Sequence, residues 1–274
     1  MFRAARGAAV FFCLALALPC SVEAGTIAPH RALYDLSLAS ARASGGVVGV
    51  QGRMLFEWGD ACDGWTVQQR YRMRLSQAQD DEVEIVSSLA SWESKDGMRY
   101  RFALKKKRGD EPEEEVRGSA RLDGPGRGGR ARFVRPEESK LDLPRGTVFP
   151  STHTIEVIRR AEAKEHFFGR RVFDGSEVEA PVDVSAFIGP AKPAGGDGVK
   201  PAAGEAGKTR NLADRPGWKV RLAFFPSASK DPLPDYEIGL VLLDNGVSSD
   251  MLIDYGDFTV RARLKELEPV RGGC

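Results

Sequence analysis

Apolar and polar side chains alternate with a period of two through most of the chain that follows the first two dozen residues. Residues 65–75 show this most clearly. One set of alternating positions carries Trp65, Val67, Gln69, Tyr71, Met73 and Leu75, and the other carries Thr66, Gln68, Arg70, Arg72 and Arg74. Because successive side chains of a β-strand point to opposite faces, this pattern predicts a strand with one buried face and one solvated face.

Similar patterns predict further strands near residues 34–38, 48–58, 83–93, 98–104, 116–122, 130–134, 140–143, 171–173, 178–188, 218–224, 236–242, 251–255 and 258–264. One face of the strand at 48–58 is expected to carry Val48, Val50, Gly52, Met54, Phe56 and Trp58. Asp96-Gly97 and Asn245-Gly246 are typical of tight hairpin turns. The sequence therefore predicts an all-β fold, a single domain of about a dozen or more antiparallel strands in a barrel-like or coiled sheet.

One helix is predicted to interrupt the strands. The stretch at residues 149–152 supplies a proline and a hydroxyl side chain suited to a helix N-cap. Ile155, Ile158 and Ala161 then recur at helical spacing, up to about Glu165. So short a helix is marginal in water by itself, so we expect its apolar face to pack against one end of the curved sheet.

The first 24 residues have the features of a signal peptide. Arg3 and Arg6 precede an apolar run at residues 8–18, and residues 22–24 form a small-residue cleavage site before Gly25. The run is shorter than the roughly 20 residues that span a bilayer, and no later segment is apolar enough to do so. A lipoprotein anchored through Cys20 is an alternative that Pro19 fits poorly. We expect a secreted chain that does not span the membrane, with one domain at residues 25–274.

Residues 189–215 differ from the rest of this domain in composition. They consist largely of alanine, glycine, proline, lysine and aspartate, with almost no large apolar side chains. Such a segment buries too little apolar surface to offset the entropy lost on ordering. We interpret it as a flexible surface insertion between strands, in preference to a linker between two domains.

The charge of the mature chain is balanced. The full sequence has 40 basic and 39 acidic residues, and cleavage before Gly25 removes two arginines and one glutamate, which leaves 38 of each. Proteins that bind a phosphate backbone carry a marked basic excess. The sequence therefore predicts no nucleic-acid partner.

Cleavage would also leave Cys62 and Cys274 as the only cysteines, since Cys13 and Cys20 lie in the signal peptide. Two cysteines in an oxidising compartment usually pair, although two independent thiols are the alternative. A bond between them would enclose almost the whole domain. In the chain-entropy model, a loop of that length is worth about 5 kcal/mol of stability.

No familiar catalytic or metal-binding motif is present. His30, His153 and His166 are too scattered for a local ligand motif, and no G-x-S-x-G nucleophile elbow occurs. The pairs Asp60/Asp63 and Asp254/Asp257 could serve acid–base chemistry, but aspartates at such positions more often shape turns, as we also expect of residues 174–176. Trp58 and Trp65 would pack around the disulfide or, alternatively, line a ligand site. We predict no catalytic residue, metal site or cofactor.

Several segments together resemble a known family. They are residues 30–36 (HRALYDL), 52–65, 149–154 (FPSTHT), 173–176 (FDGS) and 250–258, followed by the terminal cysteine. In this order they resemble the EipB-like cell-envelope integrity family over essentially the whole mature chain. The resemblance implies a periplasmic protein of a Gram-negative bacterium, whose antiparallel strands wind into a spiral or open barrel with one associated helix. It also implies a disulfide between Cys62 and Cys274, a role in envelope integrity under stress, and no established catalytic activity.

Three classes of function remain open. The first is a non-catalytic envelope protein, expected to be a monomer, that contacts envelope proteins or cell-wall and lipid components. The second is a carrier that holds a lipid or lipoprotein acyl chain within the curved sheet, and a continuous apolar cavity would favour it. The third is an enzyme of unknown reaction, which would need ionisable side chains with shifted pKa values clustered in a cleft.

Overall fold

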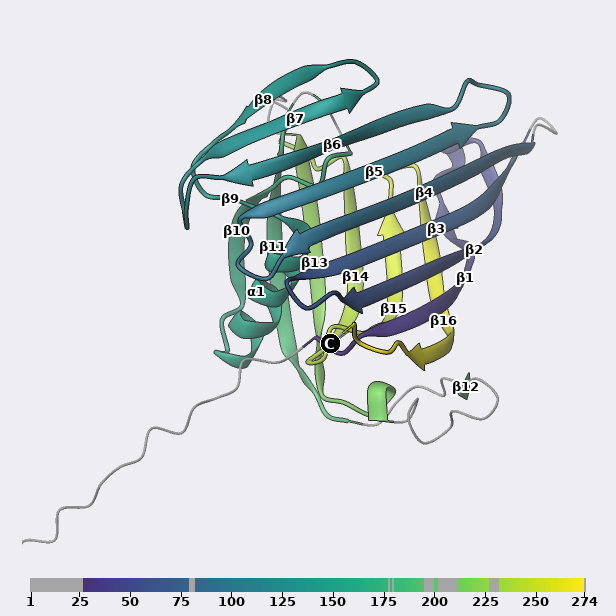
Figure 1. Ribbon diagram of the computed structural model, residues 1–274. Coiled ribbons are helices and arrows are strands. Elements are labelled where there is room, and N and C mark those ends of the chain that lie inside the picture. The colour runs from purple at the N-terminus through teal and green to yellow at the C-terminus, as the bar shows by residue number, and fades with distance from the viewer. Residues whose placement is uncertain are drawn as a thin grey trace, which may run out of the picture.

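The computed structural model describes residues 27–78, 82–176, 178, 180–194, 200–201, 211–226 and 232–273. The predicted signal peptide and Gly25 lie outside these residues. No helix in the described part is long and apolar enough to cross a membrane. Its strands form one 16-stranded sheet that bends round on itself (Figure 1). The predicted all-β class and open-barrel architecture are confirmed.

The strands fall into a front and a rear layer (Figure 1). The front layer comprises β1 (His30–Ala41), β2 (Val47–Asp60), β3 (Gly64–Gln77), β4 (Glu82–Ser94), β5 (Arg99–Arg108), β6 (Glu114–Leu122), β7 (Gly129–Arg135) and β8 (Ser139–Leu143). The rear layer comprises β9 (Thr147–Val148), β10 (Phe167–Val172), β11 (Val182–Lys192), β13 (Gly217–Pro226), β14 (Tyr236–Leu243), β15 (Ser248–Asp254) and β16 (Phe258–Pro269). The two-residue strand β12 (Lys200–Pro201) lies off this order and pairs only with β16. A short 3-10 helix, η1 (Ala43–Gly45), precedes β2, and the α-helix is α1 (Pro150–Glu162).

The two layers are continuous along one side and separate along the other. Strand β1 pairs with β16 in antiparallel fashion, so that the first and last strands join the layers. The free edges of the sheet are β8 and β9. All pairings are antiparallel except two short ones, β9 with β10 and β12 with β16. The barrel is therefore open between its free edges.

An aromatic cluster bridges this opening. Tyr100 and Phe102 on β5 pack with Phe133 on β7, and with Phe149 and Phe173 from the segments that flank α1 and β10. Each of these five rings is almost completely buried. The Tyr100 hydroxyl also donates a hydrogen bond to the backbone carbonyl of the residue after Phe173, at 3.0 Å. The cluster holds the far end of the front layer against the rear layer without strand pairing.

The predicted faces of the strands are confirmed for most positions, but Val178 is exposed and lies before β11, which begins at Val182. On β3, Trp65, Met73 and Leu75 are buried while the arginines on the opposite face are exposed. On β2, however, Val48 is 60% exposed and its neighbour Val47 is buried. The register between β2 and β3 shifts between Val47 and Gly49, and this irregularity reverses the alternation at the start of the strand. The expectation for Val48 was wrong for this reason.

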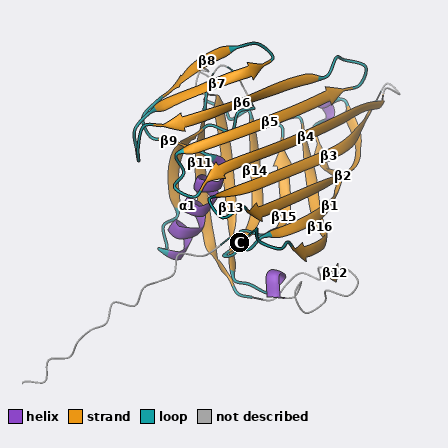
Figure 2. Cartoon of the chain, viewed as in Figure 1, coloured by secondary structure: helices purple, strands orange, loops and turns teal. Residues whose placement is uncertain are grey.

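Helix α1 lies at the end of the barrel near the β4–β5 hairpin (Figure 2). It starts with Pro150 at its first position and ends at Glu162, three residues earlier than expected. Val157, Ile158 and Ala161 pack in a buried cluster with tryptophans from β2, β3 and β13. The helix therefore closes this end of the barrel by burying its apolar face.

The predicted insertion at residues 189–215 is too wide at both ends. Strand β11 continues through Gly189 to Lys192 and pairs with β13 there. At the other end Leu212 is buried in the core, and Arg215 forms an ion pair with Asp244 at 2.8 Å. Leu212 is a large apolar side chain within this stretch, and its burial orders the residues around it. Residues 195–199 and 202–210 lie outside the described residues.

Candidate functional site

Cys62 lies in the tight turn between β2 and β3. Its backbone is left-handed, with φ of 64°, and its N–H donates to the Asp60 carboxylate at 3.0 Å. Cys62 is disulfide-bonded, while Cys274 lies outside the described residues. The N–H of Gly273 donates to the backbone carbonyl of Asp60 at 2.8 Å, so the end of the chain reaches this turn. The pairing of Cys62 with Cys274 stays a prediction that this approach favours.

The two tryptophans beside the turn belong to the core. Trp58 is 4% and Trp65 is 7% exposed, and their rings meet edge to face with centroids 6.1 Å apart. The Lys95 ammonium lies 3.0 Å from the centre of the Trp65 ring and 3.0 Å from an Asp60 carboxylate oxygen. Trp58 and Trp65 therefore pack beneath α1 and do not line any of the surface hollows described below.

Two of the four aspartates considered for acid–base chemistry, Asp60 and Asp254, shape turns, and so does Asp174, as expected. The Asp60 carboxylate accepts the N–H of Cys62, and that of Asp254 accepts the N–H of Gly256 at 2.9 Å. Asp174 accepts both the N–H and the hydroxyl of Ser176, at 2.9 and 2.7 Å. Each pattern is a side-chain-to-backbone turn of the kind aspartate favours.

The three histidines lie on separate elements. His30 is fully buried on β1, and burial lowers its pKa. His153 is buried within α1, and burial lowers its pKa to about 4. His166 is exposed just before β10, with its ring 3.0 Å from the carbonyl of Ile188. Among the described residues, no three or more His, Cys, Asp or Glu side chains gather in a way that could hold a metal ion.

Glu93 is a buried acid near the start of α1. Its carboxylate accepts the backbone N–H of Ser151 at 2.7 Å and that of Thr152 at 2.8 Å, as well as the Thr152 hydroxyl. Burial raises the pKa of this carboxyl, and the hydrogen bonds from Thr152 and Ser151 oppose that effect. The expected hydroxyl N-cap is therefore replaced by a carboxylate from β4, since Phe149 occupies the N-cap position without a side-chain cap.

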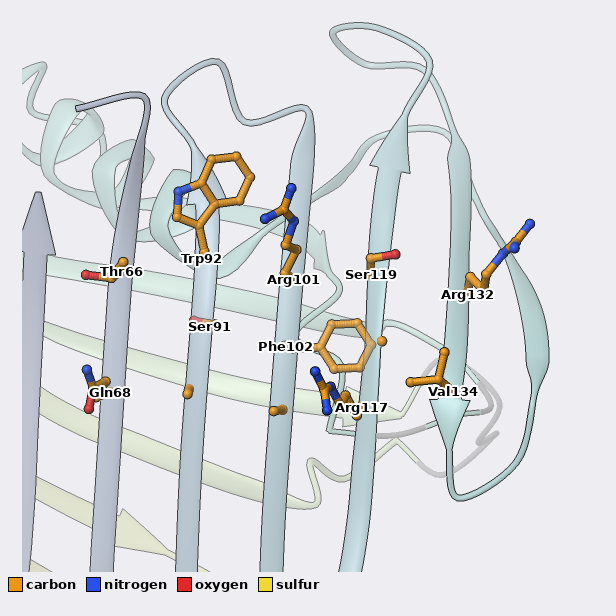
Figure 3. Close-up of a pocket in the computed structure, with 13 residues that line it drawn as sticks. Thr66, Gln68, Ser91, Trp92, Arg101, Phe102, Arg117, Ser119, Arg132 and Val134 are labelled. Carbon is orange, nitrogen blue, oxygen red and sulfur yellow. The ribbon is translucent and has the colours of Figure 1, made fainter. Parts of the chain in front are cut away.

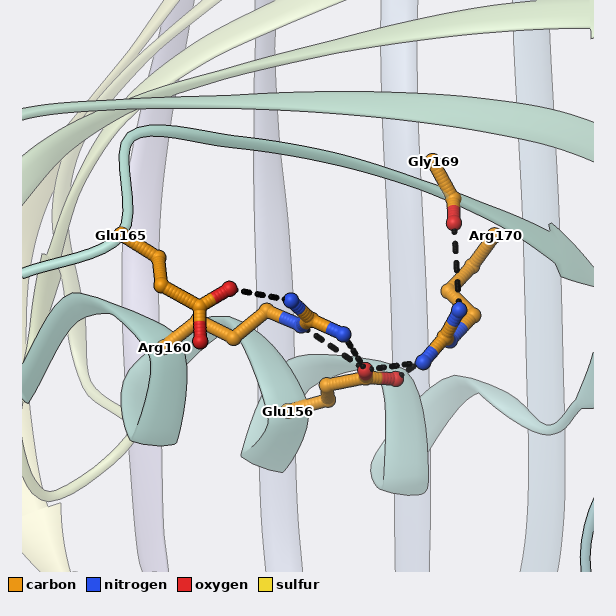
Figure 4. A network of polar contacts seen from close by, with 5 residues as sticks. All are labelled: Glu156, Arg160, Glu165, Gly169 and Arg170. Atoms are coloured by element: carbon orange, nitrogen blue, oxygen red, sulfur yellow. Dashed lines mark hydrogen bonds and ion pairs between the residues drawn. The ribbon is translucent and has the colours of Figure 1, made fainter. Parts of the chain in front are cut away.

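A second buried acid, Glu156, ties α1 to the rear layer (Figure 4). Its carboxylate bonds to Arg160, one turn along the helix, and to Arg170 on β10 at 2.5–2.8 Å. Arg160 also pairs with Glu165 just beyond the helix end. Burial works against ionisation of Glu156, but the hydrogen bonds from Arg170 and Arg160 lower its pKa below the ordinary value. Both of these buried carboxylates are thus engaged in holding α1 in place.

The outer face of the front layer carries a groove of about 500 Å³, which we call the β3–β7 groove (Figure 3). Two neighbouring rows of cross-strand partners line it. The first row comprises Thr66, Trp92, Arg101, Ser119 and Arg132, and the second comprises Gln68, Ala90, Ala103 and Arg117. At the β7 end of the second row the register shifts, so that Arg117 pairs with Arg135, and Val134 lines the groove beside this irregularity. Because neighbouring strands lie about 4.8 Å apart, the groove runs about 20 Å across the strand direction.

Three arginines dominate the β5–β7 end of this groove. Ser119 pairs with Arg101 on one side and with Arg132 on the other, and Arg117 lies two residues along the same strand. All three arginine side chains are exposed. Within the described residues, none of them has a carboxylate within ion-pair distance. At the other side, the Arg101 guanidinium lies 5.0 Å from the centre of the Trp92 ring.

Two further hollows on the same face also contain basic side chains. One, of about 560 Å³, is lined by Arg53, Arg72 and Arg74, with Asp35 beside them. The other, of about 400 Å³, is lined by Arg132 and Lys140, with Glu138. Basic residues thus concentrate on the outer face of the front layer.

The sequence contained a signal for this face that the overall charge concealed. Arginines recur at alternating positions in the segments that become β3, β5, β6 and β7, and one strand face must then carry them all. A net charge near zero does not show whether the charges are evenly spread. The balance of charge is therefore no argument against a local basic surface.

The fold defines an open, barrel-like all-β protein with one capping helix, and comparisons with known proteins place it more closely. The EipB-like family model matches residues 21–271. Cell envelope integrity protein EipB from Brucella abortus (strain 2308) is 33% identical over 271 residues, covering 97% of this chain and 92% of that protein. The chain therefore belongs to the EipB-like family, and the resemblance seen in the sequence is confirmed.

A solved structure agrees with the fold. The chain is similar to a crystal structure described as a beta-barrel-like protein of domain of unknown function DUF1849, from Brucella abortus. The TM-score is 0.79 at 33% sequence identity, and the match covers 90% of this chain and 100% of that chain.

Proposed function

We propose that this chain is a non-catalytic periplasmic protein that supports cell-envelope integrity under stress. The observation that carries this proposal is its relationship, over nearly its whole length, to a protein named for cell envelope integrity. The signal peptide predicted at residues 1–24 supports export. The basic outer face, with its three hollows, offers a surface for contacts with envelope components.

The non-catalytic part of the proposal rests on what the buried ionisable groups do. Glu93 bonds to the start of α1, and Glu156 bonds to Arg160 and Arg170. Neither carboxylate lines any of the three hollows on the outer face. A general acid or base must reach a substrate proton, whereas these groups have their hydrogen-bonding capacity used within the fold.

Deletion and complementation in the source bacterium test this proposal. The deletion strain should lose survival on detergent and on other envelope stresses, and the full-length gene should restore it. A gene that lacks codons 2–24 should fail to restore survival, although it encodes the entire folded domain. Full restoration by this cytoplasmic form, or no loss of survival on deletion, would contradict the proposal.

An aromatic row inside the barrel favours a second candidate, a carrier of lipid or lipoprotein acyl chains. Phe224 stacks on Tyr236 at 4.3 Å between ring centres, Tyr236 lies 6.4 Å from Tyr255, and Tyr255 lies 5.2 Å from Phe258. Tyr255 is 42% exposed and the other three rings are half-buried. Burial raises the pKa of Tyr255 to about 12, with a contribution from Tyr71 on the opposite layer. Half-buried rings facing an interior are suited to contact with an apolar ligand.

Native mass spectrometry separates the two candidates. Mature protein purified from its own periplasm would carry lipid at near one-to-one stoichiometry if it is a carrier, and solvent extraction would identify that lipid. A clean apo mass would count against the carrier and leave the contact role.

A further inference from the structure

We propose that the β3–β7 groove binds the phosphate-bearing headgroup of an anionic phospholipid, and that the basic outer face thereby docks on an anionic membrane surface. This inference deepens the proposed function, because it names the envelope component that the protein would contact. It concerns the outer face of the barrel and is independent of any ligand in the interior.

The first argument is the arrangement of cations at the β5–β7 end of the groove. Arg101 and Arg132 flank Ser119 on the neighbouring strands, so their Cα atoms are about 10 Å apart. In Figure 3 the Arg132 side chain points away from Ser119, but an arginine side chain is long enough to cover more than half of that distance, so Arg101 and Arg132 can both turn toward one bound group. Arg117 lines the groove in the second row. Guanidinium groups bind phosphate oxygens through two parallel hydrogen bonds, and the Ser119 hydroxyl can add a further donor. The site therefore suits a phosphate.

The second argument is that no carboxylate in the described residues forms an ion pair with these three arginines, although Glu138 lines the neighbouring hollow with Arg132. Three other acidic residues of this face pair with different basic side chains. Glu84 lies beside Arg72, Glu82 beside Arg74, and Glu113 beside Lys105. These pairs lie toward the opposite ends of β3–β5, away from the row that contains Arg101 and Ser119. The positive charge at the groove is therefore available to an external anion.

The third argument favours a membrane over a soluble anion. Trp92 on β4 lines the groove beside Arg101, and Val134, which is 42% exposed, lies near Arg132 at the β7 end. Tryptophan and small apolar side chains beside basic ones are suited to the boundary between headgroups and acyl chains. Two more hollows with basic side chains lie on this face, so the face can bind several anionic groups at the same time. An anionic membrane presents many headgroups side by side and can therefore contact several hollows together, whereas one small anion would occupy only one hollow.

Vesicle flotation with the mature protein, residues 25–274, tests the inference. The probes are vesicles of phosphatidylcholine alone and vesicles with about 30 mol% phosphatidylglycerol, in a buffer of about 0.1 M salt. The wild-type protein should float with the anionic vesicles. With the neutral vesicles it should remain at the bottom of the gradient. The groove variant, Arg101→Gln/Arg117→Gln/Arg132→Gln, should lower the apparent affinity about tenfold or more.

The matched control is Arg70→Gln/Lys107→Gln/Arg121→Gln. These three side chains are exposed on β3, β5 and β6 and form no ion pair within the described residues, and they do not line the β3–β7 groove. The control removes the same charge and should lower affinity by less than about threefold. Both variants should keep the wild-type melting temperature, since all six positions are exposed.

Three outcomes would overturn the inference. Equal losses in the two variants would mean diffuse attraction to the whole face without a site at the groove. No flotation of the wild-type protein would exclude membrane docking. Saturable binding of glycerol 3-phosphate or of a soluble acidic glycan, without flotation, would assign the groove to a soluble anion. Each of these results leaves the complementation test of the proposed function unaffected, so the two proposals can fail separately.

Discussion

Glu93 on strand β4 accepts hydrogen bonds from both the backbone N–H and the hydroxyl of Thr152 on helix α1. The two residues are 59 positions apart in the chain. A carboxylate at this point compensates the positive end of the helix dipole and the unpaired N–H groups of the first turn. A single side chain of the sheet thus fixes where the capping helix begins.

Replacing Glu93 with alanine should lower the free energy of unfolding by about 2–3 kcal/mol, because the N–H groups of Ser151 and Thr152 would be left buried without acceptors. Chemical denaturation of the mature protein measures this change. The control is Glu84→Ala on the same strand, where the carboxylate is half-buried on the outer face and pairs with exposed Arg72. That substitution should change stability by less than about 0.5 kcal/mol. Equal effects from the two variants would show that Glu93 does not anchor the helix.

His153 should make stability depend on pH in the mildly acidic range. Burial lowers its pKa in the folded protein to about 4, from an ordinary value of 6.5, with Glu156 and Arg170 acting in opposite directions beside it. The folded state therefore favours the neutral ring. Its contribution is fully present above pH 6.5 and is lost as the pH falls toward 4, by up to about 3 kcal/mol.

The measurement compares unfolding free energies of the wild type and His153→Gln between pH 7 and pH 4. The wild type should lose more stability over this range than the variant, since carboxylates that titrate near pH 4 contribute to both proteins. His166→Gln is the matched control, because it removes an exposed histidine just beyond the same helix. If the unfolding free energies of the wild type and of His153→Gln fall in parallel between pH 7 and pH 4, then His153 does not cause the pH dependence.

The parts of the molecule differ in how well the sequence alone predicts their structure. The strands were predictable because the alternation at positions such as Trp65 and Met73 depends only on local side-chain direction. The exposure of Val48 was not predictable, because it results from a shift of register between β2 and β3. The position of Leu212 in the core was also missed, because the composition around it gives no sign of burial.

The candidate site was the least predictable part. Trp92, Arg101, Ser119 and Arg132 come together only because four strands pair in one particular register. The sequence shows which residues face outward on each strand, but it does not show which of them are neighbours across the sheet. Glu93 as the helix cap has the same origin, a contact between segments far apart in the chain.

The cysteine pair gives a third prediction. If Cys62 and Cys274 form one bond, Cys62→Ser and Cys274→Ser should lower the melting temperature equally, and the double variant should match either single one. Loss of the bond is worth up to about 5 kcal/mol in the chain-entropy model. Calorimetry under non-reducing conditions measures all three variants. A double variant clearly less stable than both singles would show that the residues do not share a bond.

The last prediction concerns Gly118, beneath the β3–β7 groove. A Cβ added there would lie 2.4 Å from the backbone carbonyl oxygen of Arg132 and 2.7 Å from the ring of Phe102. Neither neighbour can move freely, because the carbonyl belongs to strand β7 and Phe102 is buried in the aromatic cluster. Gly118→Ala should therefore separate β6 from β7 locally and lower the free energy of unfolding by about 1–3 kcal/mol.

Gly239→Ala is the control for Gly118→Ala. Gly239 also lies within a strand, β14, but an added Cβ would meet nothing within 4 Å. Alanine also restricts the unfolded chain more than glycine does, so this variant should be as stable as the wild type or slightly more stable. The denaturation midpoints of the two variants measure this difference in stability. If Gly118→Ala is as stable as Gly239→Ala, then β6 and β7 are not as closely paired at the groove as the structure has them.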